Sequence, residues 1–341
     1  MQVSVIIPMY NAEKFIVKAM ESVLNQTFID FEFIIVNDAS KDESVRLVEE
    51  YAKKDSRIKL LHNTAEDAEH GAFAARNKGI DAAMGKYIYF MDADDFIDPK
   101  LLEDNLKLME ENDGDIVMFG YLKEVTKNGK TNCYSHHHIL EGCYDRAGLK
   151  ENIDDFWSGI SLTVWNCLFK RETMGNMRFS KMKGGSDDTV FLLEYLEHSE
   201  RIILNRREYY HYIINANSVS NRWNPAVIDS RYACAEAMKN FFKSLEISEE
   251  ECLSTMSRRM VGFYSAVIYS MSFSSCPYSS SEKMECLKEV REKLEVDRYA
   301  CFIDYRQLPF VERVKTFFIC HKKESVLVTF GPLFLKTVRG M

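Results

Sequence analysis

The sequence predicts an α/β fold in which a mostly parallel sheet carries helices on both faces, followed by a mainly α-helical C-terminal extension. Over roughly the first hundred residues, short apolar strands alternate with helical segments, an order typical of parallel sheets. The strands are near-continuous apolar runs, as strands buried on both faces are. From about residue 226 only long helical patterns remain. We therefore predict one domain over residues 1–225 and a helical domain with a basic amphipathic tail over residues 226–341.

Each element is predicted from the spacing of apolar residues, which is continuous in buried strands and repeats every three to four residues in helices. The expected strands span residues 3–7, 31–36, 58–63, 87–91, 115–122 and 201–213. The expected helices span residues 12–24, 43–54, 71–84, 99–112, 186–198, 226–245, 248–271 and 282–293. Pro8 ends the first strand, Gly85 precedes the fourth, and Asn224 and Pro225 mark the expected domain boundary.

Composition and charge exclude several classes of protein. The formal net charge of −8 argues against a nucleic-acid binder, which is normally basic. Nine scattered cysteines without a CxxC pair favour a reducing, cytoplasmic location. The N-terminus lacks the features of a signal peptide, and no apolar run reaches the ~18 residues expected of a membrane-spanning helix.

The charge is unevenly distributed along the chain. Residues 305–341 carry seven basic and two acidic side chains, a net charge of +5, among many aromatic and aliphatic residues. This composition suits a peripheral contact with the anionic inner face of the plasma membrane. The alternative is a terminal helix that packs on the protein with its basic face outward.

Three carboxylates directly follow the strand at residues 87–91: Asp92, Asp94 and Asp95. Ligands of open α/β sheets bind beyond the carboxyl ends of the strands. On an extended backbone Asp92 and Asp94 would point the same way and Asp95 elsewhere. Two convergent carboxylates are costly without a cation, and Mg²⁺ or Mn²⁺ is commonly held by one or two carboxylates plus substrate phosphates. The alternative is a solvated acidic turn that caps the next helix.

Polar and aromatic residues follow the other strands at the same expected edge. Tyr10 and Asn11 come after the first strand and its Pro8, and Asp38 comes after the second. Asp38 could accept the imide N–H of a uracil ring on which Tyr10 packs. Arg76, on the helix before the fourth strand, could reach the base or a diphosphate. The alternatives are a helix N-cap for Asp38 and a surface arginine for Arg76.

In order along the chain, SVIIPMYNAEKFI, SVLNQTF, FEFIIVNDASKDES and ARNKGIDAAMGKYIYFMDADD resemble the family 2 glycosyltransferases, which have the GT-A fold. The resemblance is dense over residues 3–99 and looser to about residue 220. It implies a nucleotide-diphosphate sugar as the ligand.

The resemblance also implies roles for individual residues. Pro8, Tyr10, the Asp38 region and Arg76 would hold the nucleobase. Asn11 and Ala93 would belong to the same donor site. Asp92 would contact the ribose or the metal, and Asp94 would be the main metal ligand. The chain departs from the family where Asn37-Asp38-Ala39-Ser40 stands in place of the usual Asp-Asp-Gly-Ser.

The segment GGSDDTVFLLEYL, residues 184–196, supplies the candidate catalytic base. Attack by a sugar hydroxyl with inversion needs a nearby carboxylate, and Asp187 and Asp188 lie in the first turn of the expected helix. The alternative is that both acids only cap that helix at its positive end. The segment resembles the family's Glu-Asp-x-x-Phe element, which implies Asp188 as the general base, with Asp187 as the fallback.

Further candidates lie in the second half of the first domain. His211 and Asn217 belong to a segment that resembles the family's element over the diphosphate, although a strand followed by a turn is the alternative. Trp165 is expected near the acceptor. Three consecutive histidines, residues 136–138, suggest a metal site, but neighbours on a strand point to opposite faces, which favours an exposed loop.

These observations predict a metal-dependent inverting glycosyltransferase of the bacterial capsule or cell-surface type. It would move one sugar from a nucleotide-diphosphate sugar, a UDP-sugar above all, to a hydroxyl of a glycan or a lipid-linked oligosaccharide. Single addition is expected because Val219 stands where processive relatives carry Gln ahead of Arg-Trp.

Two other functions are kept as alternatives. A sugar nucleotidyltransferase would need a Gly-rich basic loop after the first strand, which is absent from PMYNAEKF. A non-catalytic nucleotide-sugar or glycan-binding homologue would lose its carboxylates, which are present here. Assembly into a homo-oligomer is left open.

Overall fold

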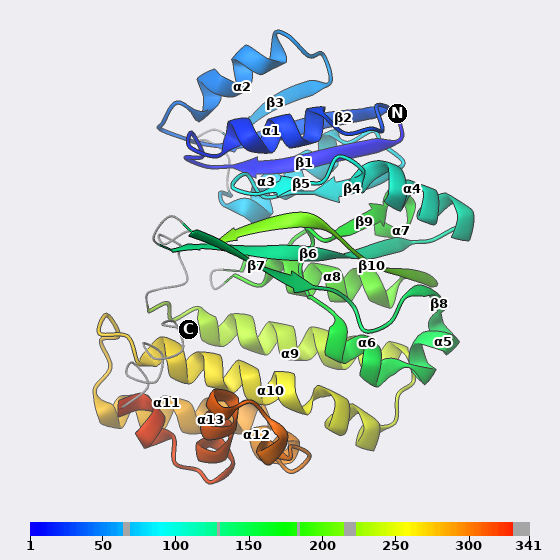
Figure 1. Ribbon diagram of the computed structural model, residues 1–341. Coiled ribbons are helices and arrows are strands. Elements are labelled where there is room, and N and C mark those ends of the chain that lie inside the picture. The colour runs from blue at the N-terminus through cyan, green and yellow to red at the C-terminus, as the bar shows by residue number, and fades with distance from the viewer. Residues whose placement is uncertain (64–68, 128–129, 183–184, 215–222, 330–341) are drawn as a thin grey trace. The chain divides into compact units, whose positions relative to one another are not determined.

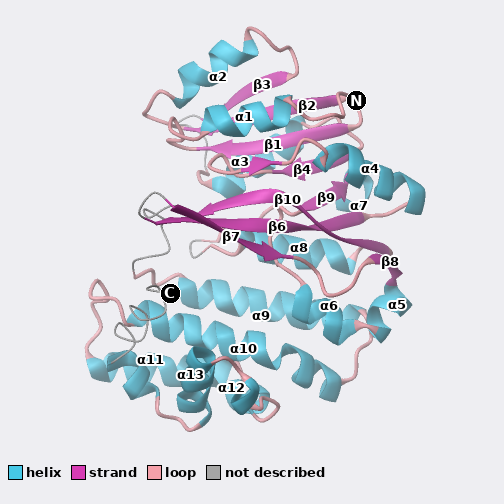
Figure 2. Cartoon of the chain, in the orientation of Figure 1, coloured by secondary structure: helices cyan, strands magenta, loops and turns pink. Residues whose placement is uncertain are grey.

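The computed structural model describes residues 1–63, 69–127, 130–182, 185–214 and 223–329. Contacts divide the chain into two compact units, Met1–Lys181 with Asp187–Ala216, and Met182–Ser186 with Asn217–Met341. Among the described residues, strands occur in the first unit alone and the second is helical (Figure 2). The sequence-based boundary at 225/226 stays a prediction.

The first unit contains a ten-stranded sheet. Its strands are β1 (Val3–Met9), β2 (Phe31–Asp38), β3 (Ile58–Asn63), β4 (Tyr87–Phe90), β5 (Phe96–Ile97), β6 (Ile116–Lys127), β7 (Lys130–His136), β8 (Gly142–Asp145), β9 (Cys167–Lys170) and β10 (Arg201–Ile214). Its helices are α1 (Ile16–Leu24), α2 (Ser44–Ala52), α3 (Ala72–Ala82), α4 (Leu101–Asn112), α5 (Arg146–Glu151), α6 (Ile153–Gly159), α7 (Arg171–Met174) and α8 (Asp187–Glu197). The α/β class predicted from the sequence is confirmed.

The strand order is β3-β2-β1-β4-β9-β6-β10-β5, with β7 paired to β6 and β8 paired to β10 (Figure 1). Strands β1, β2, β3, β4, β6 and β10 run in one direction, and the other four run against them. The sheet is therefore mostly parallel, as expected. It also brings the carboxyl ends of β1, β2 and β4 to one edge.

The two faces of β1 pack against different helices because successive side chains alternate across a strand. Val5 and Ile7 belong to the core that α1 completes on one face. On the other face, Ile6 lies against α3, where a Cβ added at Gly79 would collide with the Ile6 side chain. The absence of a side chain at Gly79 therefore allows α3 to pack closely on the sheet and sets the distance between that helix and β1.

Residues 130–174 hold elements that the sequence did not predict, namely β7, β8, β9 and the short helices α5 to α7. All seven residues of β7 are exposed, so this strand has no apolar pattern. Strand β9 has only four residues, buried between β4 and β6. Strand β6 also extends beyond residue 122, because its outer half pairs with β7.

An aromatic cluster holds α8 on the same face of the sheet as α3. Phe191 of α8 stacks on Phe179 at 3.9 Å between ring centroids and meets the edges of Phe90 and Phe169. Phe90 is paired in register with Ile6 through their neighbouring strands. The first turn of α8, which carries both candidate acids, is therefore fixed by burial of the apolar residues behind it.

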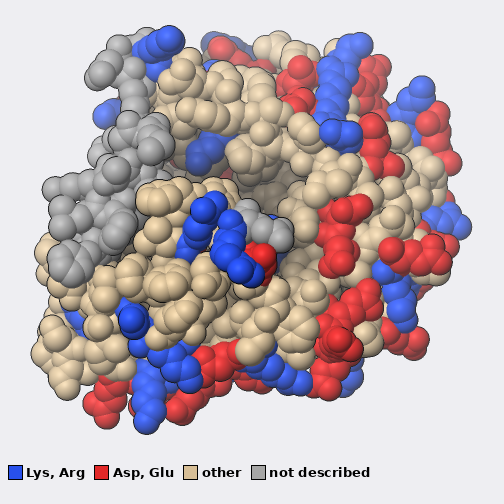
Figure 3. Space-filling model, turned by 60° about the horizontal axis from the view of Figure 1, so that its bottom comes forward, with Lys and Arg blue, Asp and Glu red and all other residues tan. Residues whose placement is uncertain are grey.

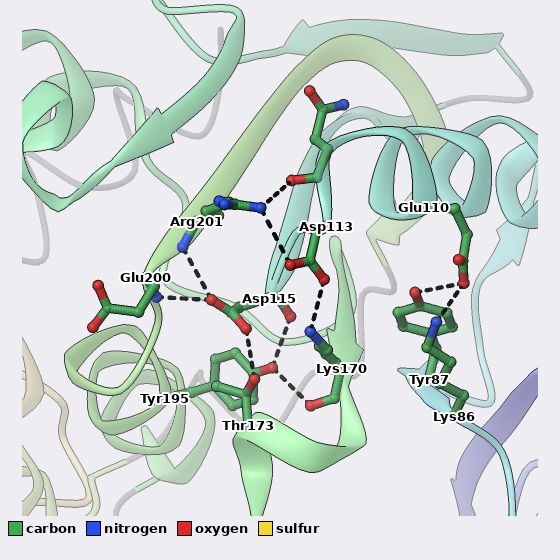
Figure 4. A network of polar contacts seen from close by, with 11 residues as sticks. Lys86, Tyr87, Glu110, Asp113, Asp115, Lys170, Thr173, Tyr195, Glu200 and Arg201 are labelled. Atoms are coloured by element: carbon green, nitrogen blue, oxygen red, sulfur yellow. Dashed lines mark hydrogen bonds and ion pairs between the residues drawn. The ribbon is translucent and has the colours of Figure 1, made fainter.

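The far end of α8 is tied to the sheet by a polar network around Asp115 (Figure 4). The Tyr195 hydroxyl lies 2.7 Å from the backbone oxygen of Asp115 and 2.9 Å from that of Lys170. The Asp115 carboxylate accepts the Thr173 hydroxyl at 2.7 Å and the backbone N–H groups of residues 200 and 201. The network joins α8, β9 and the starts of β6 and β10.

The second unit consists of α9 (Val227–Ser244), α10 (Glu249–Met271), α11 (Ser280–Lys293), α12 (Val296–Ala300), the 3₁₀ turn η2 (Tyr305–Gln307) and α13 (Phe310–Cys320). The buried Arg291 and Glu324 form an ion pair, and Tyr264 donates to Glu324 at 3.1 Å. This cluster joins α10 and α11 to the segment after α13. Acidic and basic side chains are mixed over the face drawn in Figure 3.

Replacing Tyr195 with Phe removes the hydroxyl that links α8 to the backbone oxygens of Asp115 and Lys170. The Asp115 oxygen keeps the Lys170 N–H as a donor, so we expect the free energy of unfolding to fall by about 1–1.5 kcal/mol in urea titrations, as for the loss of a buried hydrogen bond. The matched control is Tyr134→Phe, at a tyrosine that is 51% exposed, where a change within about 0.5 kcal/mol is expected. Equal small effects at both sites would show that the network does not anchor α8.

Candidate active site

The loops after β1 and β2 are linked by hydrogen bonds at the carboxyl edge of the sheet. The Asn11 backbone N–H donates to the Ser40 hydroxyl at 3.0 Å, and the Asn11 side chain accepts the Lys41 N–H at 2.8 Å. Asn11 adopts a positive φ of 47°, a conformation that asparagine tolerates better than most residues. Beside it, Tyr10 is 60% exposed and Pro8 is half-buried. Their roles in base binding stay predictions.

Asp38, at the end of β2, is bound to the start of α3. Its carboxylate accepts the Gly71 N–H at 2.7 Å and the Asn63 amide at 3.1 Å, and it lies 3.0 Å from the His70 imidazole. Asp38 therefore positions the N-terminus of the helix that carries Arg76. Its predicted contact with a uracil ring stays a prediction.

The three acids after β4 lie on a turn and not on an extended backbone. Strand β4 ends at Phe90, and the Asp95 N–H donates to the Asp92 oxygen at 3.4 Å across the turn. The extended backbone expected for these residues is therefore wrong, and the convergence of Asp92 and Asp94 on one ligand stays a prediction. Within the turn, Asp94 is exposed, Asp92 and Ala93 are half-buried, and Asp95 is 2% exposed.

Asp95 fixes this turn against β10. Its carboxylate accepts the Tyr210 hydroxyl at 2.6 Å and the Ile213 backbone N–H at 2.7 Å. The same Tyr210 oxygen accepts the Asp92 N–H at 3.3 Å. Burial, reinforced by the charge of Asp92, raises the pKa of Asp95 to about 8. Asp95 and Tyr210 were not singled out as site residues from the sequence, and the third acid of the DADD run was the one available signal.

Arg76 is the buried cation of the site. Its side chain is 7% exposed and reaches Asp92 at 3.0 Å and Asp187 at 3.2 Å. Burial alone would lower the pKa of Arg76, but the negative charges of Asp92, Asp187 and Asp188 outweigh burial and raise it. The guanidinium also lies 5.4 Å from the centre of the Phe179 ring. Its Nε atom is buried without a hydrogen-bond partner in the described part of the chain.

The two acids of α8 differ in environment. The Asp187 carboxylate is paired with Arg76, whereas the Asp188 carboxylate accepts the Thr189 N–H at 2.9 Å. Burial, followed by the charges of Asp187 and Asp92, raises the pKa of Asp188 to about 6, although Arg76 acts in the opposite direction. A carboxyl group with this pKa is deprotonated at neutral pH and still basic enough to take a proton.

Aromatic rings line β10 next to the acidic turn. Trp165 stacks on Tyr210 at 4.4 Å and on Tyr212 at 5.6 Å between ring centroids. His211 lies 2.7 Å from Glu124 and stacks on Phe96, the residue after Asp95, at 4.1 Å. The structure thus brings Trp165 and His211 close to the turn. Asn217, the other candidate, lies outside the described residues.

The turn offers oxygen donors of the kind that Mn²⁺ and Mg²⁺ prefer. Asp94 is the exposed acid of the turn and stays the first candidate ligand, and Asp92 also contacts Arg76. Within the described ranges, no group of three or more His, Cys, Asp or Glu side chains is arranged to hold a metal. The residues therefore fit a cation that takes its other ligands from a diphosphate and water, as such ions commonly do.

The chain matches the sequence model of Glycosyl transferase family 2 over residues 4–173. It is 30% identical over 263 residues to the uncharacterized glycosyltransferase EpsJ of Bacillus subtilis, and the alignment covers 70% of each chain. Both findings agree with the resemblance noted in the sequence.

Solved structures share the fold. The crystal structure of S. aureus TarS 1-349 superposes with a TM-score of 0.65 at 18% identity, covering 96% of this chain and 91% of that one. The structure of TarS 1-349 in complex with UDP-GlcNAc superposes with a TM-score of 0.58 at 21% identity, covering 90% of this chain and 92% of that one. The mannosyltransferase PcManGT of Pyrobaculum calidifontis, in complex with GDP-Man and Mn²⁺, superposes with a TM-score of 0.52 at 15% identity. The superposition covers 94% of this chain and 86% of that one.

At these identities the structural likeness establishes the GT-A type of fold, and the relative at 30% identity establishes the family. A sugar nucleotidyltransferase and a non-catalytic binding homologue, the alternatives considered from the sequence, are thereby set aside. The chain belongs to glycosyltransferase family 2 and is a glycosyltransferase.

Proposed function

We propose that this enzyme transfers a single sugar, with inversion, from a UDP-sugar to a hydroxyl group of a glycan or lipid-linked oligosaccharide, and that the reaction requires Mn²⁺ or Mg²⁺. One observation carries the proposal. Asp188 lies beside the cluster of Arg76, Asp92 and Asp187. The candidate base is therefore next to the candidate diphosphate site, although Asp92 and Asp188 are 96 residues apart in the sequence.

The donor would lie along the carboxyl edge of the sheet. Tyr10 offers an exposed ring to the base. The buried Nε of Arg76, which has no partner among the described residues, is a donor that a bound nucleotide sugar can satisfy. The complexes of TarS with UDP-GlcNAc and of PcManGT with GDP-Man and Mn²⁺ support a nucleotide sugar and a divalent ion. When bound, such an ion stabilises the negative charge of a leaving diphosphate. Asp94, with Asp92 beside it, would hold it.

Inversion needs a base that acts on the acceptor from the side opposite the leaving group. Asp188 would accept the proton of the attacking hydroxyl as the bond to the anomeric carbon forms. The charge of Arg76 opposes the effect of burial on the pKa of Asp188. Asp187 is held by Arg76, which leaves Asp188 as the better base and Asp187 as the alternative.

The proposed setting is surface or capsular polysaccharide synthesis on the cytoplasmic side of the plasma membrane. Among the described residues, no helix is long and apolar enough to cross a membrane. Peripheral contact through residues 305–341 is supported by Phe310, which is 73% exposed, and Phe317, which is 37% exposed, beside the basic Arg313 and Lys315 of α13. Residues 330–341 lie outside the described part. A homo-oligomer remains an open alternative.

Replacing Asp94 with Ala removes the proposed metal ligand. We expect UDP release in the presence of Mn²⁺ to fall by about 100-fold or more, because the leaving diphosphate loses its counter-charge. The assay uses a panel of UDP-glucose, UDP-galactose, UDP-GlcNAc and UDP-GalNAc. Asp30→Ala, at a side chain 57% exposed, is the matched control and should leave UDP release unchanged. An Asp94→Ala enzyme with full metal-dependent activity would contradict the assignment.

Replacing Asp188 with Asn should remove transfer but leave UDP binding within a few-fold of wild type, with a loss of about 10²–10⁴ in kcat. Because burial raises the pKa of Asp188 to about 6, the wild-type kcat/KM should fall about tenfold per pH unit below that value, as the base becomes protonated. Residual activity of the Asn variant should lack this acidic limb. A wild-type profile that is flat from pH 5 to 7 would exclude Asp188 as the base.

A further inference from the structure

A cavity of about 380 Å³ lies in the first unit, between β6, the end of β7 and the loop after α6. This volume falls within the ~300–1,000 Å³ typical of small-ligand pockets. Tyr121 of β6, Ser158 of α6 and Ser161 of the following loop contribute to its wall. None of the described residues that line it is Lys, Arg, Asp or Glu. The cavity is therefore suited to an uncharged ligand.

The histidine run borders this cavity. The sequence favoured an exposed loop for residues 136–138, but His138 is 3% exposed and lines the cavity together with His136 and His137. Its Nε2 atom is buried with no hydrogen-bond partner in the described part of the structure. A buried polar atom without a partner is costly, and a ligand with hydroxyl groups would satisfy it.

The imidazoles of the buried His138 and of the exposed His136 are neutral at physiological pH. Burial lowers the pKa of His138 to about 4, against the opposing effect of the backbone groups of Met118 and Gly159, and burial also lowers the pKa of His136. A neutral imidazole carries one donor and one acceptor. Together with serine hydroxyls, such groups match the hydroxyl pattern of a sugar better than the charge of a phosphate.

Two structural links connect the cavity to the proposed active site. Tyr121 stacks on His136 at 4.7 Å and meets Trp165 at 4.7 Å, and Trp165 stacks on Tyr210, which contacts the Asp92 turn. The second link is the loop of Ser161.

In that loop the oxygen of Leu162, the residue after Ser161, accepts the hydroxyl of Thr189 at 3.0 Å. Thr189 follows Asp188 in the chain, so one wall of the cavity continues into the turn that carries the proposed base.

We propose that this cavity is a saccharide subsite that holds a sugar residue of the acceptor, next to the residue whose hydroxyl is glycosylated. The inference rests on the proposed function and adds the place in the fold where a sugar residue of the acceptor binds. His138 and the serine hydroxyls bind the sugar hydroxyls, and Tyr121 provides an apolar surface.

The test measures saccharide binding directly by saturation-transfer NMR on the full chain, with a panel of methyl glycosides of glucose, galactose, mannose, GlcNAc, GalNAc and rhamnose. Saturating UDP and Mg²⁺, a diamagnetic ion that leaves the NMR signals unbroadened, occupy the donor site. We expect saturation transfer to at least one glycoside with wild type, and its loss in Ser158→Trp, which fills the cavity from an exposed wall residue. Ser56→Trp, also at an exposed serine, is the control and should retain it.

A second variant, His138→Phe, keeps a planar ring but removes the hydrogen-bonding nitrogens. Binding of the same glycoside should weaken about tenfold, as for the loss of one hydrogen bond, while UDP affinity stays unchanged. Two results would overturn the inference. In one, the wild-type protein binds UDP but no glycoside shows saturation transfer. In the other, saturation transfer is equal in wild type and Ser158→Trp. Failure of the wild-type protein to bind UDP would instead contradict the proposed function.

Discussion

The arrangement of this enzyme's candidate site depends on one buried positive charge. Arg76 can remain ionised inside the protein only because Asp92 and Asp187 contact it and Asp188 lies nearby. These acids come from the turn after β4 and from the first turn of α8. The need to neutralise Arg76 therefore draws two distant segments together, and it does so at the edge where open α/β sheets bind ligands.

The surrounding packing prepares this ion cluster. Gly79 lets α3 lie close on β1, the Phe179–Phe191 stack places α8 beside α3, and the Asp115 network holds the other end of α8. On the opposite side, Asp95 and Tyr210 fix the acidic turn. Asp188 is then the acid of α8 left for proton transfer, with a pKa raised to about 6. The proposed mechanism needs such a base. The loop of Ser161 and Leu162, which contacts Thr189 next to Asp188, also borders the histidine-lined cavity.

The sequence predicted the regular part of this fold well. The strands β1 to β4 are continuous apolar runs, and in the helices apolar residues recur every three to four positions. It failed for β7, whose residues are all exposed, and for the turn after Phe90, whose shape is set by bonds from Asp95 to residues more than a hundred positions away. The Arg76–Asp187 contact, with a separation of 111 residues, likewise depends on tertiary packing. Residue types alone could nominate Arg76, Asp92, Asp94 and Asp188, but not the ion pairs of Arg76 with Asp92 and Asp187.

The free energy of unfolding of Arg76→Met tests most directly whether this charge organises the site. Removing the guanidinium leaves half-buried acids without a counter-charge, and the account predicts a loss of about 2–4 kcal/mol. The matched comparison is Arg178→Met, which breaks an arginine–aspartate pair with Asp81 whose side chains are 36% and 63% exposed, and should cost about 1 kcal/mol or less. Equal, small losses in the two variants would contradict the account.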